Sequence, residues 1–263
     1  MGSIITSTAS LATVIALSTM LATSCSQTKE KGPPSPAAPT TATKPAAAAS
    51  TPTVDSSAQP TTVVFDFEDG TVGALPPGFT AALVGGGGSI DWRVQARKDA
   101  HSGSQVIAQL SSDQTNTRYP HVVRDDLLAR DVDVSVSFKT IGGKVDASGG
   151  VVFRYLDKNN FYVVRANSLE GNVVAYKTEK GIRRSIGVKG KDNAYGVNVN
   201  VPHQQWNDLR VMARGQMFEV FLNGKKLFEA EDDTFTDAGK VGLWTKADAV
   251  TEFDDLRVVV FKK

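Results

Sequence analysis

Cysteine and histidine are scarce in this chain. Cys25 is the single cysteine among 263 residues, so no disulfide can form within the chain. The three histidines, His101, His121 and His203, show no spacing typical of a zinc site. We therefore expect packing and hydrogen bonds alone to hold the core, and we expect each histidine to lie at the surface.

An excess of charge of either sign is also lacking. The chain has 29 Lys and Arg against 28 Asp and Glu, which gives a formal net charge of +1, and the basic residues form no run. Proteins that bind nucleic acid or acidic membranes usually carry a basic patch or stripe. The composition therefore predicts no nucleic-acid partner.

The N-terminal part has no apolar run long enough for a stable membrane span. Residues 11–21 read LATVIALSTML, which is the length of a signal-peptide core. Small residues and then Cys25 follow, which resembles a bacterial lipobox. We predict that residues 1–25 are a signal and lipobox segment with lipidation at Cys25. The protein would be exported and contact the membrane only through this anchor; simple secretion and N-myristoylation at Gly2 are the alternatives.

Residues 26–61 lack aromatic residues, Leu and Ile, and contain seven of the eleven prolines. Such a segment cannot bury enough apolar surface to offset the entropy of ordering it. We predict a disordered Pro/Ala/Thr-rich linker. At about 3 Å per residue, it would hold a lipid-anchored domain tens of ångströms from its membrane.

Residues 62–263 contain short alternating or β-branched runs broken by Gly, Asn and Asp, and no convincing amphipathic helix. This pattern predicts an all-β, two-sheet antiparallel sandwich. The predicted strands are 63–67, 92–94, 106–110, 132–139, 150–156, 161–167, 173–177, 185–188, 206–214, 217–222, 225–230, 241–245 and 252–261.

Two features of this region predict local geometry. Apolar residues at every second position of 132–138 predict one buried strand face. Asn223-Gly224 lies between two apolar runs and predicts a type I′ hairpin, because both residues tolerate positive φ. Residues 157–160 read DKNN and predict a four-residue hairpin loop.

Three segments carry a family resemblance. They read GGVVFRYLDKNNFYVVRANSLEGNVVAYKTEKGIRR, WNDLRVMARGQMFEVFLNGKKLFEAEDDTF and AGKVGLWTKADAVTEFDDLRV. Residues 62–263 thereby resemble bacterial laminin-G/concanavalin A-like jelly rolls that are described as 3-keto-disaccharide hydrolase-like or family 16 glycoside hydrolase-like. The resemblance implies a jelly-roll β-sandwich. It also implies a glycoside hydrolase or lyase that acts on oxidised (3-keto) disaccharides.

The carboxylates of a retaining family 16 glucanase are lacking. Those enzymes place two glutamates on one strand face in an E-x-D-x-E or E-x-D-x-x-E run, about 5 Å apart. The acidic clusters at 229–233 and 252–255 do not contain such a run. The sequence therefore leaves any catalytic residue unidentified.

A carbohydrate-binding site is predicted around two arginines. If the 157–160 loop closes the hairpin, Arg154 and Arg165 project from one sheet face with Asn167 beside them. Guanidinium and amide donors suit sugar hydroxyls, a carboxylate or a keto oxygen. Trp244 could stack on a sugar ring, with Lys246 as a nearby donor. A different loop register would separate the arginines, which would then only pair with surface carboxylates.

Two further assignments concern Trp206 and a metal. Trp206 begins an apolar strand and is expected in the core. FDFEDG near residue 68 and FDDLRV near residue 254 predict a structural calcium site at Glu68, Asp254 and Asp255, supported by backbone carbonyls. Ordinary turn and strand-edge acids are the alternative.

The sequence leaves three functions open. The leading one is an extracytoplasmic carbohydrate-binding module tethered to the cell envelope, with a saccharide as its ligand. The second is the hydrolase or lyase implied by the resemblance, and the third is a structural or adhesion domain. Two carboxylates, or a carboxylate and Lys246, converging in a pocket beside the arginines would favour the enzyme. A shallow aromatic groove without convergent acids would favour the binding module.

Overall fold

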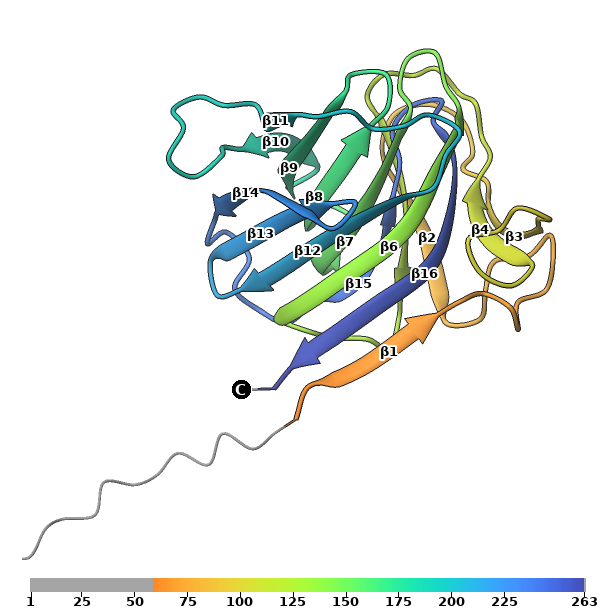
Figure 1. The fold of residues 1–263 in the computed structure, drawn as a ribbon, viewed down its shortest axis with the longest axis horizontal. Helices are drawn as coiled ribbons and strands as arrows, with labels where there is room; N and C mark the ends of the chain where they lie inside the picture. The colour runs from red at the N-terminus through yellow and green to blue at the C-terminus, as the bar shows by residue number, and fades with distance from the viewer. Residues whose placement is uncertain (1–58, 263) are drawn as a thin grey trace, which may run out of the picture. The chain divides into compact units, whose positions relative to one another are not determined.

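A computed structural model describes residues 59–262, which form two eight-stranded sheets (Figure 1). Sheet A contains β1 (Thr61–Phe65), β3 (Trp92–Ala96), β4 (Gln105–Gln109), β6 (Asp131–Gly142), β12 (Asn207–Arg214), β13 (Met217–Leu222), β14 (Lys225–Glu231) and β16 (Val250–Phe261). Sheet B contains β2 (Phe79–Gly85), β5 (Arg118–Arg124), β7 (Ser148–Asp157), β8 (Asn160–Asn167), β9 (Asn172–Glu179), β10 (Ile182–Ile186), β11 (Val197–Asn198) and β15 (Lys240–Trp244). Cys25 and residues 26–58 lie outside the described part.

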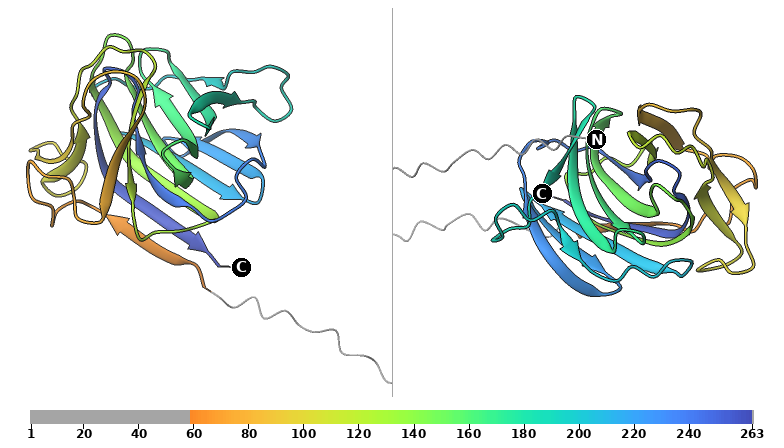
Figure 2. Two further views of the ribbon diagram at one scale, coloured as in Figure 1. Left: turned by 180° about the vertical axis from the view of Figure 1, so that it is seen from behind. Right: turned by 90° about the horizontal axis from the view of Figure 1, so that it is seen from above.

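The named strands pair antiparallel throughout, and the predicted sandwich is confirmed. Sheet A has the order β14-β13-β12-β6-β16-β4-β3, with β1 also paired to β16. Sheet B has the order β10-β9-β8-β7-β15-β5-β2, with β11 also paired to β9. The central pairs, β6 with β16 and β7 with β15, join distant parts of the sequence (Figures 1 and 2). Residues 59–262 contain no helix long and apolar enough to cross a membrane.

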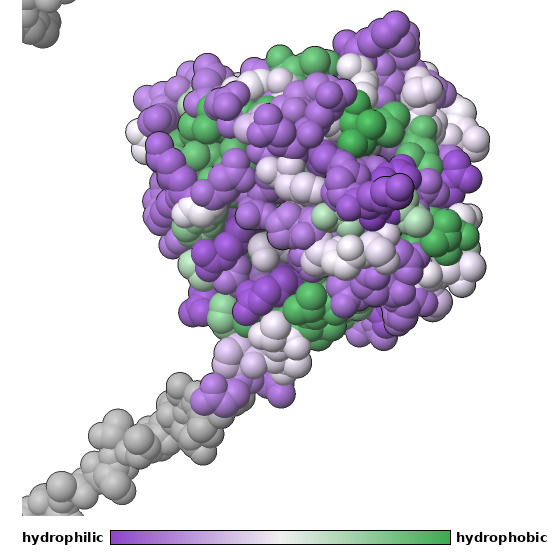
Figure 3. Space-filling view, turned by 45° about the vertical axis from the view of Figure 1, so that its right-hand side comes forward, coloured by the Kyte–Doolittle hydropathy of each residue, from purple (hydrophilic) through white to green (hydrophobic). Residues whose placement is uncertain are grey.

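The main core lies between the two sheets. Along β6, Val134, Val136 and Phe138 are buried as predicted from their alternation. Phe153 of sheet B meets Phe218 of sheet A edge-on, with ring centroids 5.1 Å apart. The outward side chains of β6 are polar, and the surface view shows apolar residues in separate patches among polar ones (Figure 3).

The two hairpin predictions have different outcomes. Asn223 and Gly224 have φ of 48° and 77°, so the predicted turn with two positive-φ residues is confirmed. The predicted hairpin at 157–160 is present, but Asp157 pairs with Asn160, so its turn has two residues and not four. The register of this hairpin does not continue along the strands: it shifts between Phe153 and Asp157, which places Gly150 opposite Arg165.

The strands predicted from the sequence do not include β2, β5 and the short β11. Strand β5 contains Pro120, a residue that normally argues against a strand within a sheet because it lacks an N–H donor. Pro120 nevertheless lies opposite Leu83 of β2, and β5 lies between β2 and β15. Strands β2 and β5 both contribute to the face of sheet B that carries the candidate site.

Candidate functional site

The side of sheet B that faces away from sheet A, here called the sheet B face, carries the candidate site. Backbone pairing places His121, Trp244, Gly150 and Arg165 opposite one another on β5, β15, β7 and β8. A second apolar cluster, which includes Trp244 and Tyr176, covers this face. Two of the predicted residues, Trp244 and Arg165, therefore share one row of the sheet. Both are buried, at 0% and 1% exposed, so the Trp244 ring offers no open face for a sugar, in contrast to the prediction.

Gly150 separates these two side chains. A Cβ atom at Gly150 would lie 3.0 Å from the carbonyl oxygen of Val164 and 3.2 Å from Cβ of Arg165. Any larger residue would therefore crowd Arg165. The glycine leaves room on the sheet between the indole ring and the guanidinium group.

Aromatic rings surround a second arginine on this face. Tyr119 stacks on Trp244 with ring centroids 5.8 Å apart and an interplanar angle of 12°. The Arg183 guanidinium lies 4.3 Å from the ring centroid of Tyr176, 4.6 Å from that of Tyr119 and 5.6 Å from that of Trp244. We call these three rings and Arg183 the arginine box. Its contacts are cation–π interactions, since Arg183 forms no ion pair within residues 59–262.

A buried carboxylate lies at the end of the same face. Asp146 Oδ2 accepts hydrogen bonds from Asn167 Nδ2 at 3.1 Å and from Lys246 Nζ at 3.2 Å. Asp146 has no exposed surface. Burial raises the pKa of Asp146, and a hydrogen bond with Ser148 and the positive charges of Lys246 and Arg165 oppose this shift only in part. The structure thus brings Asn167 and Lys246 together around an acid that sequence reasoning did not identify.

Arg165 is held in place by several acceptors. Its guanidinium donates to Asn172 Oδ1, to Glu170 Oε2 at 2.6 Å and to the Tyr176 hydroxyl at 3.1 Å. The Tyr176 hydroxyl also hydrogen-bonds the hydroxyl of the half-exposed Tyr195. Arg165 thereby connects the acidic end of the face to the arginine box.

Several buried polar atoms on this face have no hydrogen-bond partner within residues 59–262. They are Arg165 Nε, Arg183 Nη1, Trp244 Nε1 and His121 Nε2. Buried side-chain atoms of the other sheet, such as Trp92 Nε1 and Gln105 Oε1, lack a partner among the described residues as well, and all of these atoms are closed to solvent. They therefore do not mark a binding site by themselves.

Arg154 does not belong to this site, and its prediction is wrong. It adopts a φ of 46° at the irregularity in β7, and its guanidinium lies 5.6 Å from the ring centroid of Phe218 in the core. It donates to three backbone carbonyls, those of Arg130, Phe235 and Gly215. Arg154 is therefore a structural residue that closes one end of the space between the sheets.

Two other expectations need correction. His121 is fully buried, not at the surface, and burial lowers its pKa to about 4. Trp206 lies outside both apolar clusters and is only partly buried; its Nε1 donates to the Asp99 carbonyl at 2.9 Å. His101 and His203 are exposed, as predicted.

The residues proposed for calcium all bind the 101–105 loop. Glu68 accepts hydrogen bonds from the backbone N–H groups of Ser104 and Gln105, at 2.8 and 2.7 Å. Asp254 accepts from the Ser102 N–H, and Asp255 accepts from the Ser102 hydroxyl and contacts His101. No group of three or more His, Cys, Asp or Glu within residues 59–262 is arranged to hold a metal ion. Calcium binding stays a prediction.

The fold has solved relatives of low sequence identity. The carbohydrate-binding module CBM66 from Bacillus subtilis is 17% identical, with a TM-score of 0.53; the match covers 68% of this chain and 94% of that one. The cellulose-induced protein Cip1 is 14% identical with the same TM-score; the match covers 74% of this chain and 96% of Cip1. These similarities show the jelly-roll fold.

No curated protein matches this chain. Residues 82–259 match the model of the 3-keto-alpha-glucoside-1,2-lyase-like domain, which covers most of both sheets and all the residues of the arginine box. The chain therefore belongs to the 3-keto-alpha-glucoside-1,2-lyase-like domain family.

Proposed function

We propose that the sheet B face binds a saccharide. The observation that carries this proposal is the arginine box, in which the partly exposed Tyr119 and Arg183 lie beside Arg165. Sugar hydroxyls both donate and accept hydrogen bonds, so they would accept from the Arg183 guanidinium. The apolar side of the sugar ring would pack on Tyr119.

A titration with oligosaccharides tests this proposal. Purified full-length protein would be titrated with gluco-, xylo-, arabino- and fructo-oligosaccharides and with a 3-keto-α-glucoside, while the intrinsic tryptophan fluorescence is recorded. We expect a saturable change that Tyr119→Ala and Arg183→Met each weaken at least tenfold. Lys158→Met, in an exposed turn, is the control. Equal binding by all four proteins would reject the sheet B face as the site.

The proximity of Asp146 and Lys246 favours a second function, the elimination reaction that the family description names. In a 3-keto-α-glucoside the keto group acidifies the proton on C2. A base removes that proton, a C1–C2 double bond forms, the C1–O bond breaks, and the leaving oxygen takes a proton. The raised pKa of Asp146 suits a general base, and Lys246 could stabilise the developing enolate or donate the proton.

Catalysis and binding can be separated at Asp146. Asp146→Asn keeps the shape and the acceptor oxygen but removes the base. If the protein is a lyase, this variant should bind the 3-keto-α-glucoside with little change while turnover falls at least 100-fold. A wild-type protein that binds without forming an unsaturated product would reject the lyase and leave the binding function.

We also propose that the domain is exported and tethered through Cys25 and the 26–61 linker. The support is the apolar run before Cys25 and the proline-rich composition after it. Cys25→Ser in a bacterial host should move the protein from the membrane to the soluble fraction. An unchanged distribution would reject the anchor.

We also propose a structural calcium site at Glu68, Asp254 and Asp255. An unchanged melting temperature in excess chelator would reject it.

A further inference from the structure

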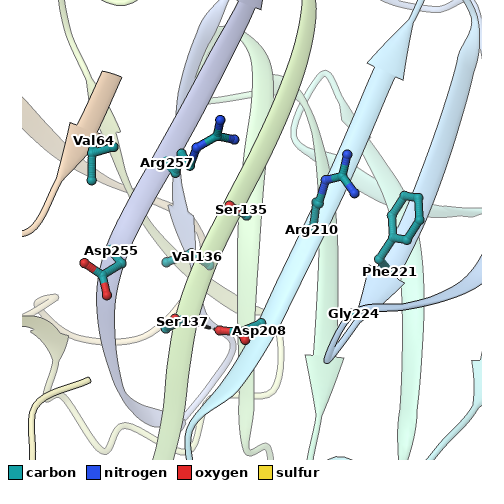
Figure 4. A pocket seen from close by; sticks show the side chains of 10 residues that line it. All are labelled: Val64, Ser135, Val136, Ser137, Asp208, Arg210, Phe221, Gly224, Asp255 and Arg257. Carbon is teal, nitrogen blue, oxygen red and sulfur yellow. Dashed lines mark hydrogen bonds between the residues drawn. The ribbon is translucent and has the colours of Figure 1, made fainter. Parts of the chain in front are cut away.

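A separate groove crosses the outer side of sheet A, the side that faces away from sheet B. It has a volume of about 470 Å³. Figure 4 shows its side chains on β1, β16, β6, β12 and β13. We call it the sheet A groove; its lining includes Ser135, Asp208, Arg210, Phe221, Asp255 and Arg257.

The groove follows from the sizes of side chains in one row of the sheet. Backbone pairing places Val64, Arg257, Ser135, Arg210 and Phe221 opposite one another on five adjacent strands. The middle strand contributes a small serine, while the strands on either side contribute arginines. The small serine side chain therefore lies in a depression between the longer side chains of Arg257 and Arg210, with the Ser135 hydroxyl group at its centre (Figure 4).

The charges along the groove are largely balanced. Arg210 donates to both oxygens of Asp133, at 2.7 and 2.6 Å. Asp208 accepts from the Ser137 hydroxyl at 2.7 Å and forms no ion pair with the residues described here. Arg257, which is exposed, likewise has no ion-pair partner within residues 59–262. The carboxylate of Asp255 also lines the groove and contacts the His101 ring at 2.7 Å. Since carboxylates and guanidinium groups both line the groove, it does not select a strongly charged ligand.

An aromatic ring completes one end of the groove. The Phe221 ring is partly exposed, and the Arg210 guanidinium lies 4.7 Å from its centroid. This contact and the Asp133 pair hold Arg210 upright beside the ring. The groove therefore offers an apolar surface at Phe221, a hydroxyl floor, and a free donor group and a free acceptor group.

We propose that the sheet A groove is a second saccharide-binding site, specific for a neutral sugar chain. The guanidinium of Arg257 would donate to sugar hydroxyls and the carboxylate of Asp208 would accept from them. Phe221 would pack against the apolar side of a sugar ring. The five strands span about 19 Å at about 4.8 Å per strand spacing, which suits an extended chain of sugars better than a single ring.

Two sites on opposite outer sides of the sandwich would make the domain bivalent. A single long polysaccharide or two neighbouring chains could engage both sheets, and linked binding events raise the overall avidity without new contacts. This inference does not depend on the sheet B face, because the two sites share no residue.

Chemical-shift mapping on the full-length protein tests the groove. The ¹⁵N-labelled chain would be titrated with neutral gluco-, xylo-, arabino- and fructo-oligosaccharides of four to six sugars. We expect at least one of them to shift the backbone amides of Ser135, Arg210 and Phe221. The indole N–H of Trp244, assigned with Trp244→Phe, reports the sheet B face separately.

Two groove variants and one control make the test decisive. Arg257→Ala and Phe221→Ala should each weaken the sheet A shifts at least fivefold and leave any Trp244 shift unchanged. Lys158→Ala, in an exposed turn of the other sheet, should change neither. Sheet A amides that stay unmoved with every sugar, or shifts that survive both variants, would overturn the groove as a site. Trp244 shifts alone would support only the sheet B face.

Discussion

Arg154 and Arg165 lie on adjacent strands of one sheet but on opposite sides of it. Arg165 faces outward, where the Nε atom has no partner within residues 59–262, while Arg154 turns into the space between the sheets. Arg154 is 1% exposed, and three backbone carbonyls accept its hydrogen bonds. Arg165 is also 1% exposed, and its guanidinium donates to three side chains on the outer side of the sheet. The two arginines therefore stabilise different parts of the fold, Arg154 the space between the sheets and Arg165 the sheet B face.

Replacing Arg154 should destabilise the fold without changing the sheet B face. In Arg154→Met, the carbonyls of Arg130, Phe235 and Gly215 lose a charged donor, and we expect the free energy of unfolding to fall by about 3 kcal/mol. Urea unfolding measures this loss. Arg184→Met, an exposed arginine, should change stability by less than about 0.5 kcal/mol. Equal stability of the two variants would contradict the structural role of Arg154.

The position of Arg183 over the aromatic rings can be tested by comparing it with Arg184, the next residue in the sequence. Its guanidinium covers the rings of Tyr119, Tyr176 and Trp244, so Arg183→Ala should expose Trp244 to solvent. We expect a red-shifted tryptophan emission and stronger quenching by acrylamide. Arg184→Ala, which contacts none of these rings, should leave both unchanged. The same emission from all three proteins would mean that Arg183 does not cover the indole.

At the scale of strands, the irregularity in β7 explains the main error of the sequence-based site. Side chains normally alternate between the two sides of a strand. At the irregularity, Phe153 and Arg154 both lie on the core side, and Tyr155 lies in the outer cluster. The sequence near residues 157–160 predicts a turn, but nothing in it marks the positive φ of Arg154. Gly239 packs directly against this irregularity. A Cβ atom at Gly239 would lie 2.5 Å from the Arg154 carbonyl carbon, which is too close for any larger residue.

Gly150 provides a prediction at the same scale. Gly150→Ala places a Cβ against the Val164 carbonyl and Arg165, so β7 or the arginine must shift. We expect a loss of about 1–2 kcal/mol in unfolding free energy and at least a fivefold weaker saccharide affinity at the sheet B face. Gly187→Ala is the control, since a Cβ there meets nothing within 4 Å. Unfolding and fluorescence titrations measure both effects, and an unaltered Gly150 variant would contradict the close fit.

At the scale of the whole molecule, buried His121 predicts how stability depends on pH. Its pKa is about 4 in the folded protein and 6.5 when unfolded, because burial disfavours the charged ring. Between pH 6.5 and 4 the unfolded chain therefore binds a proton that the folded chain does not. His121 should contribute full stability above pH 6.5 and progressively destabilise the fold toward pH 4, by about 3 kcal/mol in total.

Urea unfolding at pH 7 and pH 4 would measure this contribution. His121→Phe keeps a ring beside Tyr155 and Phe161 and removes the proton site, so the loss of stability between the two pH values should shrink by about 3 kcal/mol. His203→Gln, at an exposed position, should retain the loss seen in the wild-type protein. An unchanged loss in His121→Phe would contradict the prediction.

The sequence predicts the architecture better than the site. The apolar alternation of 132–138 and the Asn223-Gly224 turn are local signals, and the structure confirms both. Arg165, Asn167, Trp244 and Lys246 do gather at one face. Asp146 could not be found, because it lies in an unremarkable loop and becomes buried only when β7, β8 and β15 come together. Long-range pairing creates that environment, and no spacing along the chain encodes it.

The pairing of β1 with β16 sets how the domain would respond to a pulling force. Thr61 lies opposite Val260, and β1 pairs with no other strand among residues 59–262. A force that pulls on the chain at residue 59 would therefore act first on the Thr61–Val260 end of this strand pair. Its hydrogen bonds would break one after another, not all together. The domain would yield first by peeling off β1, which removes Val64 from the wall of the sheet A groove and leaves the sheet B face folded.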